Sequence, residues 1–307
     1  PMIRSPLRPW ALRLHRWLAL LFALPLLVVT ASGLMLAAEP ALKATAPPGT
    51  VTLARLEAVL AAAGPGAGGA SLFIRAYDGT VTLGGRGAAR TYDLATAAPA
   101  EPGRLAAAFV TARRLHETLL LDARWLVTAS TVAMLLLAPL GLVLGWPKVR
   151  HTVGGWHRLV GWALLPLVIG SPLTGLALAF GISFVPAADP PSGSPPSLGQ
   201  TVRLVVERHG TLDGLEFVRT VRGGARIVRA LDAGGTAVTY RAMPNGLEPV
   251  PANWPRLLHE GAWGGVLGSA ANALAGIALL GLLVTGLVLW SRRTLRRRAL
   301  RRAAVTA

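Results

Sequence analysis

Four of the six histidines in this 307-residue chain occupy matching places, which makes them the first candidates for chemistry. These are His15, His116, His157 and His259, and each lies shortly before a long apolar stretch. Ionisable side chains beside a membrane helix usually mark a cofactor or an ion pathway. Two imidazoles on facing helices supply the two axial ligands that a non-covalent b-type haem requires. We therefore predict two haem b groups, with iron ligated by His15 and His157 in one and by His116 and His259 in the other.

Other metal chemistry fits this pattern less well. The chain has no cysteine, which excludes disulfides, iron–sulfur clusters, thiolate metal sites and covalent haem attachment. Zinc and copper usually need three or four protein ligands at one place, and two separated pairs do not supply them. A lone histidine at a helix end is more often an interfacial residue than a ligand, but four in matched pairs favour ligation.

The remaining titratable residues near these histidines leave alternatives open. Glu117 and Glu260 each follow a predicted ligand, and they either orient the imidazoles or relay protons, or form salt bridges with Arg113 and Arg256. Of the other two histidines, His151 is expected to be solvated in a basic loop. His209 is expected to cap the end of a helix.

Basic and small residues surround the predicted ligands. Arginines suit the anionic propionates of haem. The candidates are Arg13, Arg16 and Arg158 beside one pair, and Arg113, Arg114 and Arg256 beside the other. Small residues give a flat macrocycle room to approach, and the candidates are Gly33, Gly141, Gly161, Gly175, Gly264, Gly265 and Gly268.

Four uncharged apolar stretches must position these residues. The chain is 52% hydrophobic with a mean hydropathy of +0.51, which is high for a soluble domain. Each stretch is long enough to cross a hydrocarbon core of about 30 Å, so the predicted fold class is a mainly α membrane protein with a bundle of four transmembrane helices. The stretches are Trp17–Ala38, Trp125–Trp146, Leu159–Phe184 and Ala262–Trp290.

The net charge of +17 is distributed unevenly along the chain. Fourteen basic residues and no acidic ones lie before the first stretch, between the second and third, and after the fourth. This positive-inside pattern predicts a membrane protein with both termini in the cytoplasm. The basic C-terminal tail suits anionic membrane lipids better than nucleic acid, which we do not expect as a partner.

The two halves of the chain repeat, which indicates an internal duplication. His15 and His157 each stand 18 residues before a Gly-Leu-x-Leu motif. Leu-His-Glu precedes the second and fourth stretches, and the histidine lies 30 residues before Trp146 in one and 31 before Trp290 in the other. At 1.5 Å per residue, 30 residues correspond to about 45 Å of helix, so electron transfer between the two haems would be slow unless tilt or haem size shortens the gap.

Each half also contains an exported segment that predicts a small α+β module. Thr52–Ala63 and Gln200–His209 have helical patterns ended by glycine. Strands are predicted at Ser71–Tyr77, Thr80–Leu83, Arg90–Leu94, Glu216–Val221, Ala225–Leu231 and Ala237–Arg241. The predicted order is helix 1 at 9–38, module 1 at 39–112, helix 2 at 113–146, a cytoplasmic loop at 147–156, helix 3 at 157–184, module 2 at 185–255, helix 4 at 256–291 and a basic tail at 292–307.

These motifs together resemble the PepSY-associated transmembrane family of bacterial inner-membrane proteins. The resemblance rests on His15-Arg16-Trp17-Leu18, Leu115-His116, Trp156-His157-Arg158-Leu159-Val160-Gly161 and Leu258-His259-Glu260-Gly261. The exported modules look like PepSY units. Tyr92-Asp93-Leu94-Ala95-Thr96 is similar to their closing strand and turn, with Ala97 where a glycine is usual.

The resemblance implies a siderophore-associated ferric reductase with two b haems, which transfers electrons across the membrane to a periplasmic Fe(III)-siderophore. No nucleotide or flavin motif is present, so quinol or a cytoplasmic reductase is the expected donor. Alternatives are a non-enzymatic protein that binds or inhibits an exported protease or partner, and a haem b carrier for a separate reductase. An anionic chelate could be attracted by exported arginines, although a solvated sheet face explains them equally well. They are Arg55, Arg75, Arg203, Arg219, Arg222, Arg226 and Arg229.

Overall fold

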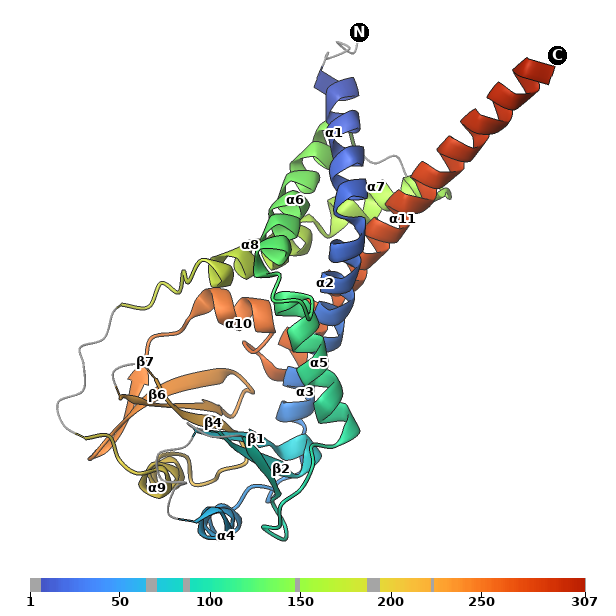
Figure 1. Cartoon of the computed structure of the whole chain (residues 1–307). Coiled ribbons are helices and arrows are strands. Elements are labelled where there is room, and N and C mark those ends of the chain that lie inside the picture. Colours follow the sequence, from blue (N-terminus) through green and yellow to red (C-terminus); the bar gives the residue numbers. More distant parts are fainter. Residues whose placement is uncertain are drawn as a thin grey trace. The chain divides into compact units, whose positions relative to one another are not determined.

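The computed structural model describes residues 7–64, 71–84, 89–146, 150–186, 194–221 and 224–306 (Figure 1). The prediction for Arg222 and part of the predicted cytoplasmic loop at 147–156 concern residues outside these ranges. The chain divides into two compact units. One comprises Pro1–Ala37, Thr111–Ile182 and Ala271–Ala307, and the other comprises Ala38–Val110 and Ser183–Ala270.

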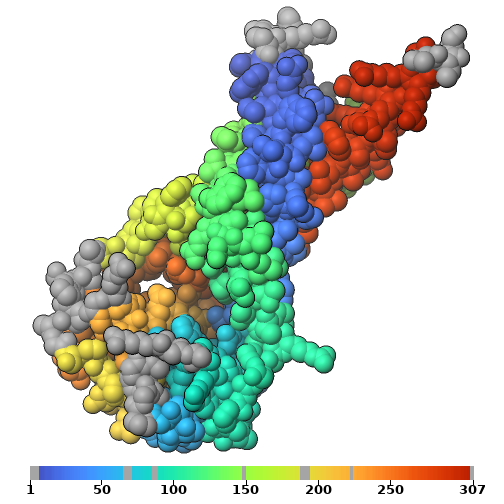
Figure 2. Space-filling view, viewed as in Figure 1, coloured from blue at the N-terminus to red at the C-terminus, as the bar shows by residue number. Residues whose placement is uncertain are grey.

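The first unit is helical. Its elements are α1 (Leu7–Leu21), α2 (Ala23–Leu36), the end of α5 (Arg104–Thr118), α6 (Arg124–Val143), α7 (Val153–Ala163), α8 (Leu165–Ala179) and most of α11 (Gly265–Thr306). Helix α6 packs against α1, α2 and α8. Helices α2 and α11 approach closely at Leu34 and Gly276, and the space-filling view shows the N-terminal helices lying against α11 (Figure 2).

Large apolar side chains cover the outside of these helices. Trp17 is 63% exposed, Leu24 is 71% exposed and Leu21 is 74% exposed. A soluble helix bundle would turn such residues inward, whereas lipid accommodates them. Three helices are long and apolar enough to cross a membrane, and a bent pair adds a fourth if the two count as one span. They are Ala23–Ala44, Arg124–Val143 and Gly265–Ala304, with Val153–Ala163 and Leu165–Ala179 as the pair.

Each of the four predicted helices is divided into two elements. The first is divided at Phe22, between α1 and α2, and the fourth between Glu260 and Gly265, where α11 begins. The stretch Leu159–Phe184 bends by 65° between α7 and α8, where Pro166 lies in the first turn of α8 and cannot donate to the preceding turn. The predicted helix at 113–146 is interrupted between α5 and α6 by a turn with left-handed backbone at Leu119, Leu120 and Asp122. His116 therefore lies on α5 and not on the spanning helix α6.

The second unit is built on one antiparallel sheet in the order β3-β2-β1-β4-β5-β6-β7. Strands β1 (Ser71–Arg75), β2 (Thr80–Gly84) and β3 (Arg90–Asp93) come from the first exported segment. The second segment supplies β4 (Leu215–Thr220), β5 (Arg226–Leu231), β6 (Ala237–Met243) and β7 (Gly246–Val250). The predicted modules are therefore halves of a single sheet, joined where Leu72 pairs with Val218 and Phe73 with Phe217.

One shared core holds the two halves together. Helices α4 (Leu53–Ala63) and α9 (Leu198–His209) pack against each other and against the sheet, burying Leu56, Val205 and the inward side chains of the strands. Thr52 caps the N-terminus of α4, and Ser197 and Gln200 form a capping box at α9. Strand β7 was not predicted, because Pro244-Asn245-Gly246 indicated only a turn.

Two short helices complete the second unit. They are α3 (Glu39–Ala44) and α10 (Trp254–Glu260), and α10 carries His259. The turn after β3 contains Ala97 at φ 56, where its amide donates to the carbonyl of Asp93. A left-handed backbone at this position explains why glycine is usual in the motif.

Candidate functional site

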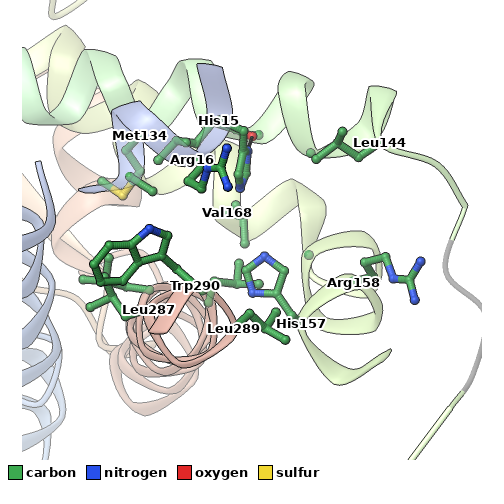
Figure 3. A pocket seen from close by; sticks show the side chains of 18 of the residues that line it. His15, Arg16, Met134, Leu144, His157, Arg158, Val168, Leu287, Leu289 and Trp290 are labelled. Atoms are coloured by element: carbon green, nitrogen blue, oxygen red, sulfur yellow. Dashed lines mark hydrogen bonds between the residues drawn. The ribbon is translucent and has the colours of Figure 1, made fainter. Parts of the chain in front are cut away.

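His15 and His157 face each other across a cavity in the helical unit (Figure 3). The cavity has a volume of about 420 Å³ and is lined by residues of α1, α2, α6, α7, α8 and α11. Its lining is mainly apolar, and Figure 3 shows Met134, Val168 and Leu287 around the two imidazoles. The centroids of the two rings are 6.4 Å apart, and their planes are 87° apart. The structure thus brings together the first predicted pair of histidines, which are 142 positions apart in sequence.

This separation fits a metal ion between the two rings. Metal–nitrogen bonds of about 2 Å and a ring nitrogen about 1 Å from its centroid place the centroids of two axial imidazoles about 6 Å apart. The mainly apolar lining suits a macrocycle, and basic side chains at its edge suit anionic substituents. The residues present therefore fit a haem held by His15 and His157.

Each imidazole is oriented by a hydrogen bond to a neighbouring helix. The Nδ1 of His15 lies 3.1 Å from the carbonyl oxygen of Leu137 on α6. The Nδ1 of His157 lies 2.8 Å from the hydroxyl oxygen of Thr285 on α11. A carbonyl can only accept, so Nδ1 of His15 carries the proton and its Nε2 presents a lone pair. Such bonds fix the tautomer of metal-binding histidines and increase their basicity.

Glycines lie beside the rings where any larger residue would meet them. A Cβ on Gly141 would lie 3.7 Å from Cε1 of His15, and a Cβ on Gly286 would lie 3.6 Å from Cε1 of His157. Gly33 is closer still to His116, because a Cβ there would come within 2.9 Å of Cε1 of that ring. Gly33 and Gly141 are among the glycines predicted to give a macrocycle room, whereas Gly286 is not.

Four arginines border the cavity, and two of them were predicted. Arg16 and Arg158 line it, as expected, whereas Arg13 is exposed and takes no part in the lining. Sequence reasoning missed Arg8 and Arg293, which also line the cavity. Both arginines lie within two helical turns of a predicted cytoplasmic helix end. Many other basic residues lie equally close to these ends, so position along the sequence did not distinguish Arg8 and Arg293.

His116 lies against the middle of α2. Its Nδ1 is 2.9 Å from the carbonyl oxygen of Val29 and 3.5 Å from the hydroxyl oxygen of Ser32. Val29 is 14 residues after His15, which corresponds to about 21 Å of helix. The expected separation of about 45 Å assumed one continuous helix from His116 to Trp146. That assumption is wrong, because the turn after Thr118 ends α5 before α6 begins.

The other residues predicted around the second pair lie on two different elements. Arg113, Arg114 and Glu117 are exposed on α5. His259 and Arg256 lie on α10 in the sheet unit. The pairing of His116 with His259 stays a prediction.

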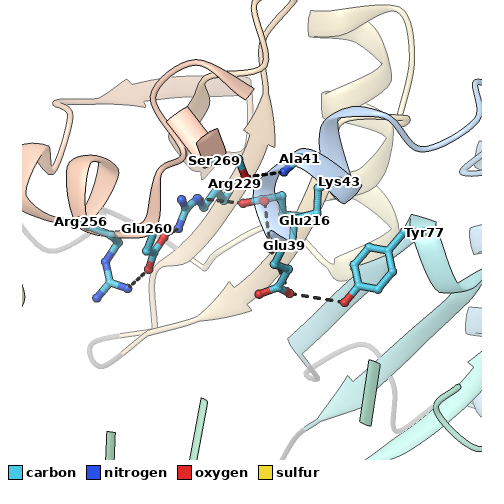
Figure 4. A network of polar contacts seen from close by, with 9 residues as sticks. All are labelled: Glu39, Ala41, Lys43, Tyr77, Glu216, Arg229, Arg256, Glu260 and Ser269. Atoms are coloured by element: carbon cyan, nitrogen blue, oxygen red, sulfur yellow. Dashed lines mark hydrogen bonds and ion pairs between the residues drawn. The ribbon is translucent and has the colours of Figure 1, made fainter. Parts of the chain in front are cut away.

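A network of ion pairs anchors α10 beside His259 (Figure 4). Glu260 accepts from Arg256 and from Arg229 of β5, each at 2.8 Å. Arg229 also pairs with Glu216 at 2.9 Å, and Glu216 pairs with Lys43 of α3 at 3.1 Å. Burial by itself would raise the pKa of Glu260, but Arg229 and Arg256 hold that pKa below its ordinary value. Of the two alternatives for Glu260, the salt bridge with Arg256 is confirmed.

The arginines predicted to attract an anionic chelate have different surroundings. Arg203 pairs with Glu57, Arg55 donates to backbone carbonyls, and Arg75 donates to Thr82. Arg226 is buried, Arg229 belongs to the ion-pair network, and Arg222 lies outside the described residues. Arg219 is exposed, and its guanidinium lies 5.1 Å from the ring of Phe217. Phe73 neighbours Phe217 across β1 and β4.

The two remaining histidines are not part of these sites. His151 is exposed, and His209 lies in the last turn of α9 with its ring 5.4 Å from that of Tyr240. Within the described ranges, no group of three or more histidine, aspartate or glutamate side chains is placed to hold a metal ion.

Comparison with known proteins identifies the family of this chain. A family model described as the PepSY-associated TM region matches residues 12–293, which is most of the chain. No curated protein matches it.

Proposed function

The chain belongs to the PepSY-associated TM region family, and on this premise we propose that it is a di-haem b membrane oxidoreductase that reduces an Fe(III)-chelate. The chelate is a siderophore, and the product is Fe(II).

The observation that carries the proposal is the facing pair of His15 and His157. Their rings are 6.4 Å apart in a mainly apolar cavity, and each Nδ1 is engaged by a neighbouring helix. His15 and His157 would ligate the haem iron, and Arg16 and Arg158 would neutralise the propionates. A bound haem supplies a reversible one-electron Fe(III)/Fe(II) couple.

His116 and His259 are the proposed ligands of the second haem. The contact of His116 with Val29 supports a depth about 21 Å along the helices from His15, roughly half the separation expected from a continuous helix. A shorter gap favours direct electron transfer between the two haems, without a bridging aromatic residue.

We also propose how the chain lies in the membrane. The bent pair α7 and α8 counts as one span, which gives four spans from an internal duplication. Both termini and the 147–156 loop face the cytoplasm because they carry the excess of basic residues. The sheet unit faces the periplasm of a bacterial inner membrane.

The reaction at the periplasmic face requires an electron and a docking surface. One electron converts the bound Fe(III) to Fe(II), which hard oxygen ligands hold less tightly, so the chelate releases it. A membrane quinol supplies two electrons, reduces two Fe(III) ions and releases two protons; a cytoplasmic reductase is the alternative donor. Arg219 and Phe217 are the residues best placed to meet an anionic chelate, because Arg219 is exposed and no carboxylate is paired with it among the described ion pairs.

Haem stoichiometry tests the proposal. Protein purified from haem-replete cells should contain two haem b per chain by pyridine haemochrome. His15→Ala and His157→Ala should each lose one and the same haem, while His116→Ala and His259→Ala should lose the other. Colourless wild-type protein would overturn the proposal in favour of a non-enzymatic, partner-binding protein. Loss of the same haem from His15→Ala and His116→Ala would overturn the pairing.

A second measurement separates a reductase from an electron carrier. An Fe(III)-siderophore added to dithionite-reduced protein should rapidly restore the oxidised haem spectrum. Protein that stays reduced would instead be a haem b carrier for a separate reductase.

A further inference from the structure

We propose that Thr285 is a positioning residue that makes the two axial ligands of the His15–His157 site unequal. The inference rests on the proposed haem at that site. It concerns how the protein orients and tunes one ligand, which neither the family nor the ligand pattern in the sequence specifies.

The hydrogen bonds of Thr285 determine which way its lone pairs point. Its hydroxyl donates to the carbonyl of Gly281, 2.6 Å away, in the preceding turn of α11. A hydroxyl has one proton, so the oxygen is left to accept from Nδ1–H of His157 at 2.8 Å. His157 is therefore held by a side-chain hydroxyl.

The corresponding place beside His15 has no hydroxyl. Aligning the two halves on Gly141 and Gly286 matches Leu137, whose carbonyl accepts from His15, with Leu282. The same alignment places Leu140 opposite Thr285. Among the described hydrogen bonds, the acceptor for His15 is thus a backbone carbonyl, whereas the acceptor for His157 is a side-chain hydroxyl.

The hydroxyl acceptor has two physical consequences. It fixes the rotation of the His157 ring, whose plane is 87° from that of His15. It also increases the electron donation of His157 to iron, because a stronger hydrogen bond at Nδ1 makes the imidazole more basic. A more basic ligand favours Fe(III) over Fe(II), so Thr285 lowers the reduction potential of this haem.

The test uses the full-length, haem-loaded protein and the variant Thr285→Val, which keeps the shape of the side chain and removes the hydroxyl. The potential of the haem held by His15 and His157 should become more positive in an optical redox titration. Second-shell bonds typically change metal affinity about 10- to 100-fold, and a tenfold loss of Fe(III) affinity alone corresponds to about 59 mV for one electron.

Ring orientation gives a readout that general destabilisation would not produce. Perpendicular imidazole planes leave two iron d orbitals nearly equal in energy, so the wild type should show a highly anisotropic low-spin ferric EPR signal. Thr285→Val should reduce that anisotropy because the ring of His157 loses the acceptor that fixes its rotation. Thr285→Ser, which restores the hydroxyl, should return both the signal and the potential to wild-type values.

Two further variants complete the experiment. Thr294→Val is the matched control, because Thr294 lies on the same helix and its hydroxyl makes the same type of bond, 3.0 Å to the carbonyl of Trp290. It should leave both readouts unchanged. If Thr285→Val does not fold, Leu140→Thr tests the inference from the other side, since a hydroxyl beside His15 should lower the potential of the same haem.

The outcomes separate this inference from the proposed function. Wild-type protein without haem overturns the proposed function itself. Wild-type protein with two haems, combined with an unchanged potential and EPR signal in Thr285→Val, overturns the role of Thr285 alone.

Discussion

Three histidines of the helical unit, His15, His116 and His157, are held in the same way. In each, Nδ1 meets an acceptor on another helix, and a glycine lies against the ring. The pairs of ring and glycine are His15 with Gly141, His116 with Gly33, and His157 with Gly286. In this arrangement the protein supplies the hydrogen-bond partner of each Nδ1, and Nε2 of His15 is directed toward the cavity.

A single alanine in the sheet unit adopts a strained backbone. Ala97 has φ 56, and the left-handed region costs a residue with a Cβ about 1 kcal/mol. We expect Ala97→Gly to stabilise the protein by about 1 kcal/mol, which a thermal melt of the purified chain would detect as a higher midpoint. Ala95→Gly in the same turn is the control, and it should lower the midpoint because φ there is not left-handed. Equal effects of both variants would contradict the prediction.

Breaks between helices determine where His116 and His259, the predicted ligands of the second haem, lie. The left-handed turn at Leu119 and Leu120 ends α5, so His116 reaches Val29 and Gly33 instead of lying at the start of a long span. The helix that carries His259 likewise ends at Gly261, where φ is 71. Both predicted ligands therefore lie on short helices that precede a spanning helix.

The position of α10 depends on Arg229, which is only 8% exposed and is shared by Glu216 and Glu260. Removing one partner of a buried ion pair leaves uncompensated charge and costs roughly 3–5 kcal/mol. Arg229→Met should therefore lower the thermal midpoint strongly, measured by fluorescence-detected size exclusion. Arg203→Met breaks the exposed pair with Glu57 and should cost about 1 kcal/mol or less. If Arg203→Met were the more damaging variant, the network would not anchor α10.

At the scale of the whole molecule, the two exported segments fold as one body. Strands β1 and β4 pair at the centre of the sheet, and the core beneath them draws on both segments. Each segment alone is near the lower size limit for an independent hydrophobic core. The continuous sheet gives the two segments a shared core. Neither segment therefore needs a complete hydrophobic core of its own.

Cooperativity across this junction can be measured. Leu72 on β1 is fully buried and lies opposite Val218, so Leu72→Ala should destabilise the sheet unit by about 2–5 kcal/mol. Hydrogen exchange followed by mass spectrometry should show faster exchange in β4 and β5 as well as in β1 and β2. Phe73→Ala, on the exposed side of the same strand, should have a much smaller effect. Faster exchange limited to residues 71–93 would mean that the two halves unfold independently.

The sequence by itself was enough to predict which residues could carry chemistry and where most helices and strands lie. Apolar length identified the spanning regions, the absence of cysteine excluded thiolate chemistry, and period-two patterns located six of the seven strands. The equal spacing of the histidines predicted how they pair. The glycines near them led to the expectation that small residues make room beside the rings. Each of these is a local property, because side-chain chemistry and backbone periodicity depend on residues close together in the chain.

Only the tertiary structure decided which residues meet. The Thr285 bond to His157 and the Val29 bond to His116 join residues far apart in the sequence, as does the strand pairing between Leu72 and Val218. Helix breaks at Leu119 and Pro166, and the rotation of each helix about its axis, determine these contacts. Small changes in such angles move a side chain by several ångströms, so spacing along the chain does not determine them.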